Sequence, residues 1–228
     1  MLLRSFCLLL MLPFVLQAKN PVFAPIKEDP ELPRVLLIGD SISIGYTLAV
    51  RENLKGKANV LRIPTNAGHT GMGLQNLSKW IDPKKGQWDV IHFNWGLWDL
   101  CYRNPESKTQ GRRDKVKGML THTPEQYAEN LEMIVQQLKK TGATLIFATT
   151  TPVPEGEAGR KVGDDLIYNQ AAIEVMKRHC IAVNDLHGVM APVLETHIVA
   201  KGDVHFKPEG SKLLAKQVAK VIEEHLSK

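Results

Sequence analysis

The sequence predicts an α/β protein in which a five-stranded parallel sheet is covered by helices on both faces. Short apolar segments bounded by turn residues alternate with segments of helical periodicity, and the order strand, helix, strand repeats along the chain. Parallel strands need crossover connections, and these are right-handed, so the helices come to lie on both faces of one sheet. The chain has 228 residues and 43% hydrophobic content, which suits one domain.

Five segments have the character of strands that are buried on both faces, because each is short and apolar between turn residues. They are Arg34–Gly39, Asn59–Ile63, Asp89–Asn94, Ala143–Thr149 and Ile181–Leu186. Parallel sheets of this kind bind ligands beyond the carboxyl ends of their strands. The sequence therefore predicts a site at that edge, walled by two long connections, Asp99–Thr123 and Thr150–Gly163.

Five further segments have helical periodicity. They are Ser43–Leu54, Gly73–Ile81, Pro124–Lys140, Asp164–His179 and Pro208–Leu226. The third has the clearest signal, because apolar residues recur at spacings of three and four behind the capping pair Thr123-Pro124. In the fourth, the predicted apolar face consists of Leu166, Ile167, Ala171, Val175 and Met176.

The first residues do not belong to this domain. Residues 1–18 hold one positive charge, Arg4, then the apolar run Phe6–Leu16 and the small residue Ala18, which is the order of a secretory signal peptide. The run is short for a membrane span, and a retained anchor is the alternative. Residues 19–33 form a proline-rich, extended lead-in, and residues 34–228 form the domain. We expect a secreted or periplasmic protein without a membrane segment after signal removal.

Cysteine content and charge add little about function. Cys7 leaves with the signal, so Cys101 and Cys180 either pair or stay as two separate buried thiols. The net charge is +5 and the pI is near 9.0, and many basic residues gather in the connection 103–117. Such a run is usually a solvated face, and without interleaved aromatic residues it does not indicate nucleic-acid binding.

Ser41 is the first candidate catalytic residue. The apolar run 34–38 ends in Gly39-Asp40-Ser41, so a strand delivers a serine to the start of a helix. Free backbone N–H groups and the helix dipole favour developing negative charge there. A serine hydroxyl is a nucleophile only when a base takes its proton. The alternative is that Ser41 only caps the helix.

His205 is the candidate base. It lies in Asp203-Val204-His205 just before the last helical segment, and Asp203 is the candidate carboxylate that orients its ring. The alternative is a surface histidine without a partner. A pairing of His205 with Ser41 is favoured because their two motifs occur together, at opposite ends of one α/β pattern.

An oxyanion hole needs donors that point at the developing negative charge. The candidates are the Ser41 N–H, the backbone N–H of Gly68, and the side chain of Asn94 at the end of the third strand. Gly71 is an alternative to Gly68, and Asn94 is equally compatible with a buried structural role.

Other chemistries find little support. Residues 39–45 lack the Lys-Ser/Thr of a phosphate-binding loop, and no Gly-x-Gly-x-x-Gly opens a helix, which argues against a nucleotide-binding domain. The eight histidines include no His-x₃-His pair, so no metal site and no cofactor are predicted. His69, His92 and His187 fit structural roles better than ligand roles.

Taken together, these motifs resemble the SGNH, or GDSL-type, hydrolase superfamily, which has a flavodoxin-like three-layer sandwich fold. Gly39-Asp40-Ser41, Gly68-His69-Thr70 and His205 match its motifs in the right order. The amino-acid sequences of residues 93–100 and 149–154 resemble those of an exported bacterial subgroup of this superfamily. The resemblance implies an esterase that cleaves an acyl ester, with acetyl as the expected acyl group, on a small molecule or a carbohydrate.

Two positions depart from the family pattern. Trp98 stands where Gly-x-Asn-Asp has asparagine, so Asn94 or the Trp98 indole N–H would donate instead. Gly202 stands where the family has its aspartate, so either Asp203 orients His205 or the site is a Ser–His dyad. The runner-up function is therefore a catalytically weakened relative that binds carbohydrate. Acyl and alcohol specificity and the oligomeric state stay open.

Overall fold

The computed structural model describes residues 20–226. The predicted signal peptide, residues 1–18, lies outside the described residues. Residues 20–33 begin with a short 3₁₀ helix, Pro21–Phe23, and continue as an irregular segment. Asn59 holds this segment against the sheet, because its side chain accepts from Asp29 N–H at 2.8 Å and donates to the Leu32 carbonyl at 2.9 Å.

Five parallel strands form the central sheet, as the sequence predicts. They are β1 (Arg34–Ile38), β2 (Asn59–Arg62), β3 (Val90–Phe93), β6 (Thr144–Ala148) and β7 (Ala182–Asn184). Their order is β2-β1-β3-β6-β7, so the strand order reverses beside β1. Strands β1 and β3 are in register from Val35 opposite Val90 to Ile38 opposite Phe93. The carboxyl ends of these two central strands thus lie side by side.

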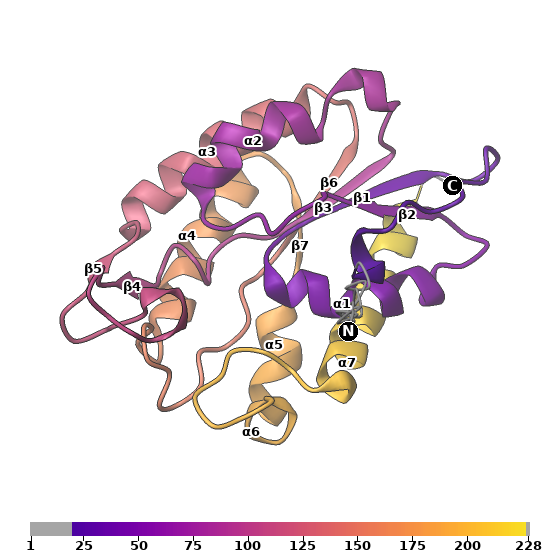
Figure 1. The fold of residues 1–228 in the computed structure, drawn as a ribbon. Helices are drawn as coiled ribbons and strands as arrows, with labels where there is room; N and C mark the ends of the chain where they lie inside the picture. The colour runs from indigo at the N-terminus through magenta and orange to yellow at the C-terminus, as the bar shows by residue number, and fades with distance from the viewer. Residues whose placement is uncertain (1–19, 227–228) are drawn as a thin grey trace, which may run out of the picture.

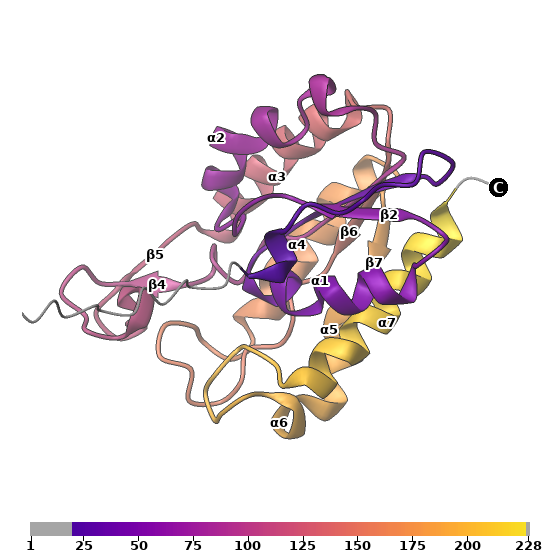
Figure 2. The same ribbon diagram turned by 45° about the vertical axis from the view of Figure 1, so that its right-hand side comes forward.

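Helices cover both faces of the sheet (Figures 1 and 2). One layer contains α2 (Thr70–Trp80), α3 (Pro124–Lys139) and α4 (Asp164–Arg178), which pack against one another in that order. The other contains α1 (Ser41–Asn53), α7 (Pro208–His225) and α5 (Leu186–Met190). Strand residues 35–38 are almost fully buried between the layers, which explains why they are apolar without alternation. The predicted α/β sandwich with a five-stranded parallel sheet is confirmed.

The face predicted for α4 is confirmed at Val175 and Met176, which are fully buried, and wrong at its first turn. Leu166 and Ile167 are more than half exposed, whereas Asp165 and Asn169 are buried. The polar side chains are buried because each has a partner: Asn169 exchanges two hydrogen bonds with the Thr150 backbone, at 2.7 and 2.9 Å, and Asp165 bonds His187 at 2.7 Å. Buried polar groups are stable when their hydrogen bonds are satisfied.

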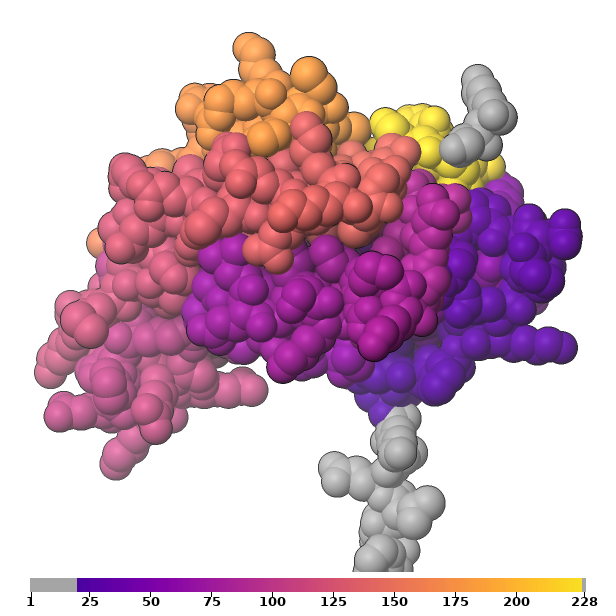
Figure 3. All heavy atoms as spheres, turned by 90° about the horizontal axis from the view of Figure 1, so that it is seen from above, coloured from indigo at the N-terminus to yellow at the C-terminus, as the bar shows by residue number. Residues whose placement is uncertain are grey.

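The long connections contain structure that periodicity does not reveal. The antiparallel pair β4 (Tyr102–Arg103) and β5 (Met119–Leu120) closes a hairpin over residues 102–120, which stands out from the body at the lower left of Figure 3. Helix α6 (Leu194–His197) and the 3₁₀ helices Pro83–Lys85, Gln110–Arg112 and Ala191–Val193 complete the elements. No helix in residues 20–226 combines the length and apolarity that a bilayer crossing requires. Cys101 and Cys180 are both free thiols. Cys101 is buried, which raises its pKa, whereas Cys180 is exposed, so the expectation of two buried thiols is wrong for Cys180.

Candidate active site

Ser41 is the first residue of α1, at the carboxyl end of β1. The helix cap is Asp40, whose carboxylate accepts from the Ile42 N–H at 2.9 Å, so the alternative that Ser41 caps the helix is wrong. Gly39, before the cap, lies so close to α1 that an added Cβ would meet Ser43 Oγ at 2.8 Å. Since Asp40 does the capping, the Ser41 hydroxyl is left for another partner.

That partner is His205. Ser41 Oγ lies 2.9 Å from His205 Nε2, although 164 residues separate the two in the chain. His205 Nδ1 lies 2.6 Å from Asp203 Oδ1. A proton on Nδ1, held by the carboxylate, leaves Nε2 free to accept from the serine hydroxyl. The three predicted residues therefore meet as a hydrogen-bonded chain, and Asp203 rather than a backbone carbonyl orients the ring.

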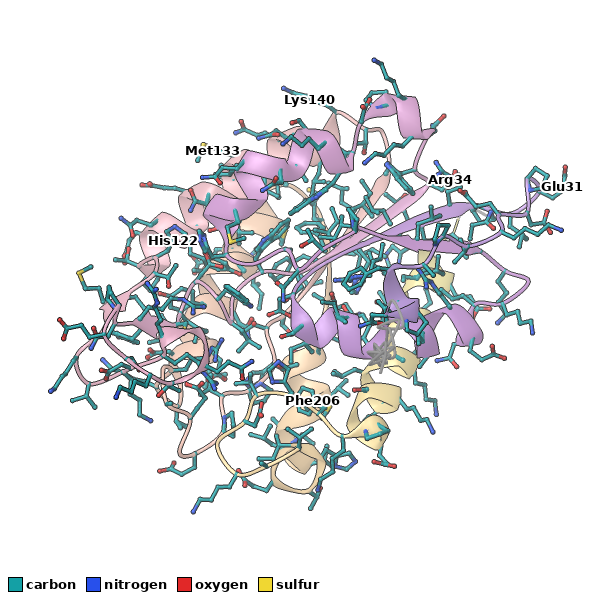
Figure 4. All side chains as sticks on the ribbon, viewed as in Figure 1. Glu31, Arg34, His122, Met133, Lys140 and Phe206 are labelled. Carbon is teal, nitrogen blue, oxygen red and sulfur yellow. The ribbon has the colours of Figure 1, made fainter. Side chains whose placement is uncertain are left out.

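The loop that carries His205 is held at several points. Val199 N–H donates to the His205 carbonyl at 2.9 Å, and Lys207 N–H donates to the His197 carbonyl at 2.8 Å. The His205 N–H donates to Asp203 Oδ1 at 2.9 Å. Figure 4 labels Phe206, beside this loop, and His122, both far from Arg34 at the start of β1. Because His205 contacts Ser41, which follows β1, the loop lies at the carboxyl end of the sheet, where the sequence predicts the site.

Two carboxylates near the serine have opposite pKa shifts. Complete burial raises the pKa of Asp40, although the Ile42 N–H, Arg160, His205 and Arg62 oppose the increase. Partial burial also raises the pKa of Asp203, but hydrogen bonds from His205 and the charges of His205 and Arg113 outweigh it, so the net pKa is lowered. Asp203 is therefore ionised at neutral pH, as an orienting carboxylate must be.

The candidate oxyanion donors are not equivalent. No residue in the range 20–226 accepts from the Ser41 N–H, which is one of the free donors at the start of α1. The Gly68 N–H donates to Asn66 Oδ1 at 2.8 Å. The Asn94 side chain is buried and donates to the Ala148 carbonyl at 2.8 Å. Gly68 and Asn94 therefore already have partners, which fits the structural alternative for Asn94.

Two alternative donors lie nearby in sequence. Trp98 is partly buried and lines the cleft that contains Ser41. The Gly71 N–H, in the first turn of α2, finds no acceptor among residues 20–226, and a Cβ added at Gly71 would lie 3.1 Å from the His69 ring and 3.3 Å from the His122 ring. Of these two residues, Trp98 is the one that shares the cleft with Ser41.

Sequence reasoning missed a network behind the cleft, centred on Asp99. This carboxylate is fully buried and accepts from the Thr70 N–H at 3.0 Å and the Thr70 hydroxyl at 2.5 Å. It also lies 2.7 Å from His122 Nδ1. The network joins the residues after β3 to the start of α2 and to the residue before the α3 cap. The signal that could have revealed it is an acidic residue in an otherwise apolar run.

The cleft around Ser41 has a volume of about 370 Å³. Its walls include His205, Asp203, Leu97 and Trp98, together with the arginines Arg103, Arg113 and Arg160. A larger hollow of about 470 Å³ lies near the start of β3 and β6, and the described residues that line it include no His, Cys, Asp or Glu. Of these two hollows, the smaller one has a serine hydroxyl within hydrogen-bond distance of a histidine among its described lining residues. Within residues 20–226, no three metal-ligating side chains of the His, Cys, Asp and Glu types gather.

Comparison with solved structures supports the fold. A lipase/acylhydrolase from Enterococcus faecalis superposes with a TM-score of 0.69 over 86% of this chain and 97% of its own, at 22% identity. An acetyl xylan esterase gives a TM-score of 0.65 over 83% and 99%, at 15% identity. An acetyl-xylooligosaccharide esterase from Geobacillus, in a mutant form, gives 0.64 over 82% and 93%, at 14% identity.

Sequence comparison identifies the family. A GDSL esterase/lipase from Arabidopsis thaliana is 29% identical over 123 residues, which are 45% of this chain and 51% of that protein. The match thus spans about half the length of that relative. The model of the GDSL-like Lipase/Acylhydrolase family matches residues 37–213, which include Ser41 and Asp203. This chain therefore belongs to the GDSL-like lipase/acylhydrolase family, a family of carboxylic ester hydrolases.

Proposed function

We propose that this protein hydrolyses carboxylic esters with Ser41 as nucleophile and His205 as general base. The observation that carries the proposal is the chain Ser41 Oγ, His205 Nε2, His205 Nδ1, Asp203 Oδ1, with its two heavy-atom distances of 2.9 and 2.6 Å. Both distances are within the range required for proton transfer and for orienting the base.

In the first step, Ser41 Oγ attacks the acyl carbonyl while its proton passes to His205 Nε2. The carbonyl π electrons move to oxygen, and the Ser41 N–H and the Trp98 indole N–H donate to the oxyanion. The intermediate collapses, the C–O bond to the alcohol breaks, and the imidazolium gives its proton to that oxygen. Water then attacks the acyl-enzyme with His205 again as base, which releases the acid and restores Ser41.

For the substrate we propose an acetyl ester on a carbohydrate. The support is the likeness of fold to an acetyl xylan esterase and an acetyl-xylooligosaccharide esterase, together with an open cleft of about 370 Å³ that has room for more than an acetyl group. Export is proposed from the signal-like pattern of residues 1–18, and membership of an exported bacterial subgroup from the resemblance of residues 93–100 and 149–154.

A carbohydrate-binding relative without turnover is the second candidate, since Trp98 and Gly202 replace residues of the family pattern. The geometry favours the enzyme, because Asp203 supplies the carboxylate that a glycine at 202 lacks. A non-catalytic protein has no need for a serine hydroxyl held 2.9 Å from an imidazole.

Labelling with a fluorophosphonate separates the two candidates. We expect stoichiometric labelling at Ser41 in the native protein and none after heat denaturation. The Ser41→Ala variant should be unlabelled and inactive toward 4-nitrophenyl acetate, whereas Ser78→Ala, which removes an exposed serine of α2, should behave as wild type. Undiminished hydrolysis by Ser41→Ala would reject the mechanism. A panel of acetylated oligosaccharides then tests the substrate class.

A further inference from the structure

Arginines form one side of the catalytic cleft. Arg103 and Arg113 come from the hairpin 102–120, Arg160 comes from the connection before α4, and all three line the cleft with Ser41 and His205. Arg113 lowers the pKa of Asp203, and Arg160 opposes the raised pKa of Asp40. Two of these guanidinium groups therefore act electrostatically on residues next to the reacting atoms.

The positive charge of this wall exceeds the negative charge that supports it. Arg113 and Arg160 share one fully buried carboxylate, Glu157, at 2.6 and 2.9 Å. Arg103 forms no ion pair with any residue in the range 20–226. Two guanidinium groups on one carboxylate and a third without any leave the wall cationic. The two carboxylates that line the cleft already have partners: Asp203 is bonded to His205, and Asp40 accepts from the Ile42 N–H.

The arginines are held in fixed positions. Arg160 Nε donates to the Leu97 carbonyl at 2.6 Å, and its Nη1 bonds Glu157. The guanidinium carbon of Arg103 lies 4.7 Å from the centre of the Trp98 ring. The Nη2 atom of each of the three arginines has no acceptor among residues 20–226, and none of these three atoms is fully buried. Preorganised guanidinium donors in this state bind planar or tetrahedral oxyanions well.

Maintaining this arrangement is costly. Burying Glu157 with two guanidinium groups requires desolvation of three charges, and apolar replacements of such clusters are often as stable or more stable. An arrangement that costs stability and lines the catalytic cleft suits a role in binding. The hairpin carries the same sign outward, with six basic and two acidic residues over 103–117.

We propose that the cleft selects esters whose alcohol part carries a negative charge, such as an acetylated uronic acid or sugar phosphate, and that Arg103, Arg113 and Arg160 bind that charge. This inference rests on the proposed function. If the acyl group is acetyl, it is too small to reach across the cleft. The arginine wall then faces the alcohol part, where a carboxylate or phosphate neutralises the surplus charge.

The test compares kcat/KM for acetylated methyl glucuronoside with that for acetylated methyl glucoside, which differ in one carboxylate. Wild type should prefer the anionic ester by about tenfold or more, as expected for one charge-assisted hydrogen bond of about 1.5–3 kcal/mol. Raising the ionic strength from 10 to 200 mM should reduce this preference, because salt screens the attraction. Acetylated glucose 6-phosphate distinguishes a phosphate from a carboxylate.

Two variants assign the effect. Arg103→Gln removes the cleft arginine that has no carboxylate partner and should reduce the preference at least fivefold. Arg112→Gln removes the same charge from an exposed position of the same hairpin that does not line the cleft, and should retain the preference. Equal kcat/KM for the two esters in wild type, or an unchanged ratio in Arg103→Gln, would overturn the inference while the esterase proposal stands. Absence of all ester hydrolysis would overturn both.

Discussion

One carboxylate oxygen of Asp203 accepts two hydrogen bonds from His205, one from the backbone N–H at 2.9 Å and one from Nδ1 at 2.6 Å. A spacing of two residues permits this, because the chain turns back so that the carboxylate reaches both groups. The aspartate therefore sets the backbone and the ring of the base together. This geometry explains how the site retains a carboxylate although Gly202 stands where the family pattern has its aspartate.

Replacing Asp203 with asparagine should lower kcat by about 10²–10⁴-fold, because an amide neither holds the Nδ1 proton as a carboxylate does nor stabilises the imidazolium. The measurement is kcat and KM for 4-nitrophenyl acetate, with KM expected to change little. Glu209→Gln removes an exposed carboxylate six residues away and is the control. A kcat for Asp203→Asn within threefold of wild type would show that Asp203 does not orient the base.

Gly202 is expected to be essential for the placement of Asp203. Its φ is +74°, and an added Cβ would lie 2.7 Å from the Gly156 carbonyl oxygen. Gly202→Ala should therefore combine backbone strain with a clash, lowering stability by about 1–3 kcal/mol and kcat/KM at least tenfold. Restoring the family spacing with Gly202→Asp should be at least as harmful.

Gly142→Ala is a matched control for this prediction, because Gly142 also has a φ of +74° but has nothing within 4 Å of an added Cβ. It should share the cost in stability from backbone strain and retain kcat/KM. Equal losses of kcat/KM in the two variants would mean that the contact with Gly156 does not position the catalytic loop.

Trp98 distinguishes the two proposed functions. In the esterase its indole N–H donates to the oxyanion, whereas in the carbohydrate-binding alternative it replaces a catalytic residue of the family pattern. Trp98→Phe retains an aromatic ring beneath Arg103 and removes the indole N–H. If that N–H donates to the oxyanion, kcat should fall by about 10²–10³-fold with little change in KM. The control is Trp88→Phe, which removes a second indole beneath an arginine, Arg34 at 4.3 Å, far from the cleft. An unchanged kcat in Trp98→Phe would show that the Trp98 indole N–H does not donate to the oxyanion beside the Ser41 N–H.

The parts of the fold that follow local patterns were predictable from sequence. The strand β1 and the helix that begins at Ser41 follow from a buried apolar run that ends in Gly39. The meeting of Ser41 and His205 was predictable as a hypothesis, because both lie at the carboxyl ends of strands or just before a terminal helix. The 164-residue separation that they bridge is a property of the topology.

Other features depend on distant partners that no local pattern reveals. Asp165 and Asn169 replace Leu166 and Ile167 on the inner face of α4 because Thr150 and His187 offer them hydrogen bonds. The hydrogen bond from the Asn94 side chain to the Ala148 carbonyl likewise depends on a residue far away in the sequence. The arginine wall depends on the hairpin 102–120, whose two-residue strands are too short to produce a period in the sequence.

His92 should make stability depend on pH. It is fully buried in β3, and its Nε2 lies 3.1 Å from the Asn184 amide nitrogen. Burial lowers the pKa of His92 to about 3, whereas an unfolded histidine titrates near 6.5. Below about pH 6.5 the unfolded chain therefore binds a proton that the folded protein does not. The stabilising contribution is complete above that pH and is lost as the pH falls toward 3.

The loss from His92 should reach about 1.4 kcal/mol per pH unit within this window. Urea unfolding at pH 7.0, 6.0 and 5.0 measures it, and the wild-type free energy of unfolding should fall more steeply than that of His92→Gln, which does not titrate. Ile91→Val, at a fully buried neighbour in β3, should lower stability by about 1 kcal/mol at every pH. It therefore controls for destabilisation alone. Parallel curves for His92→Gln and wild type would mean that His92 is not the group whose burial makes the fold sensitive to acid.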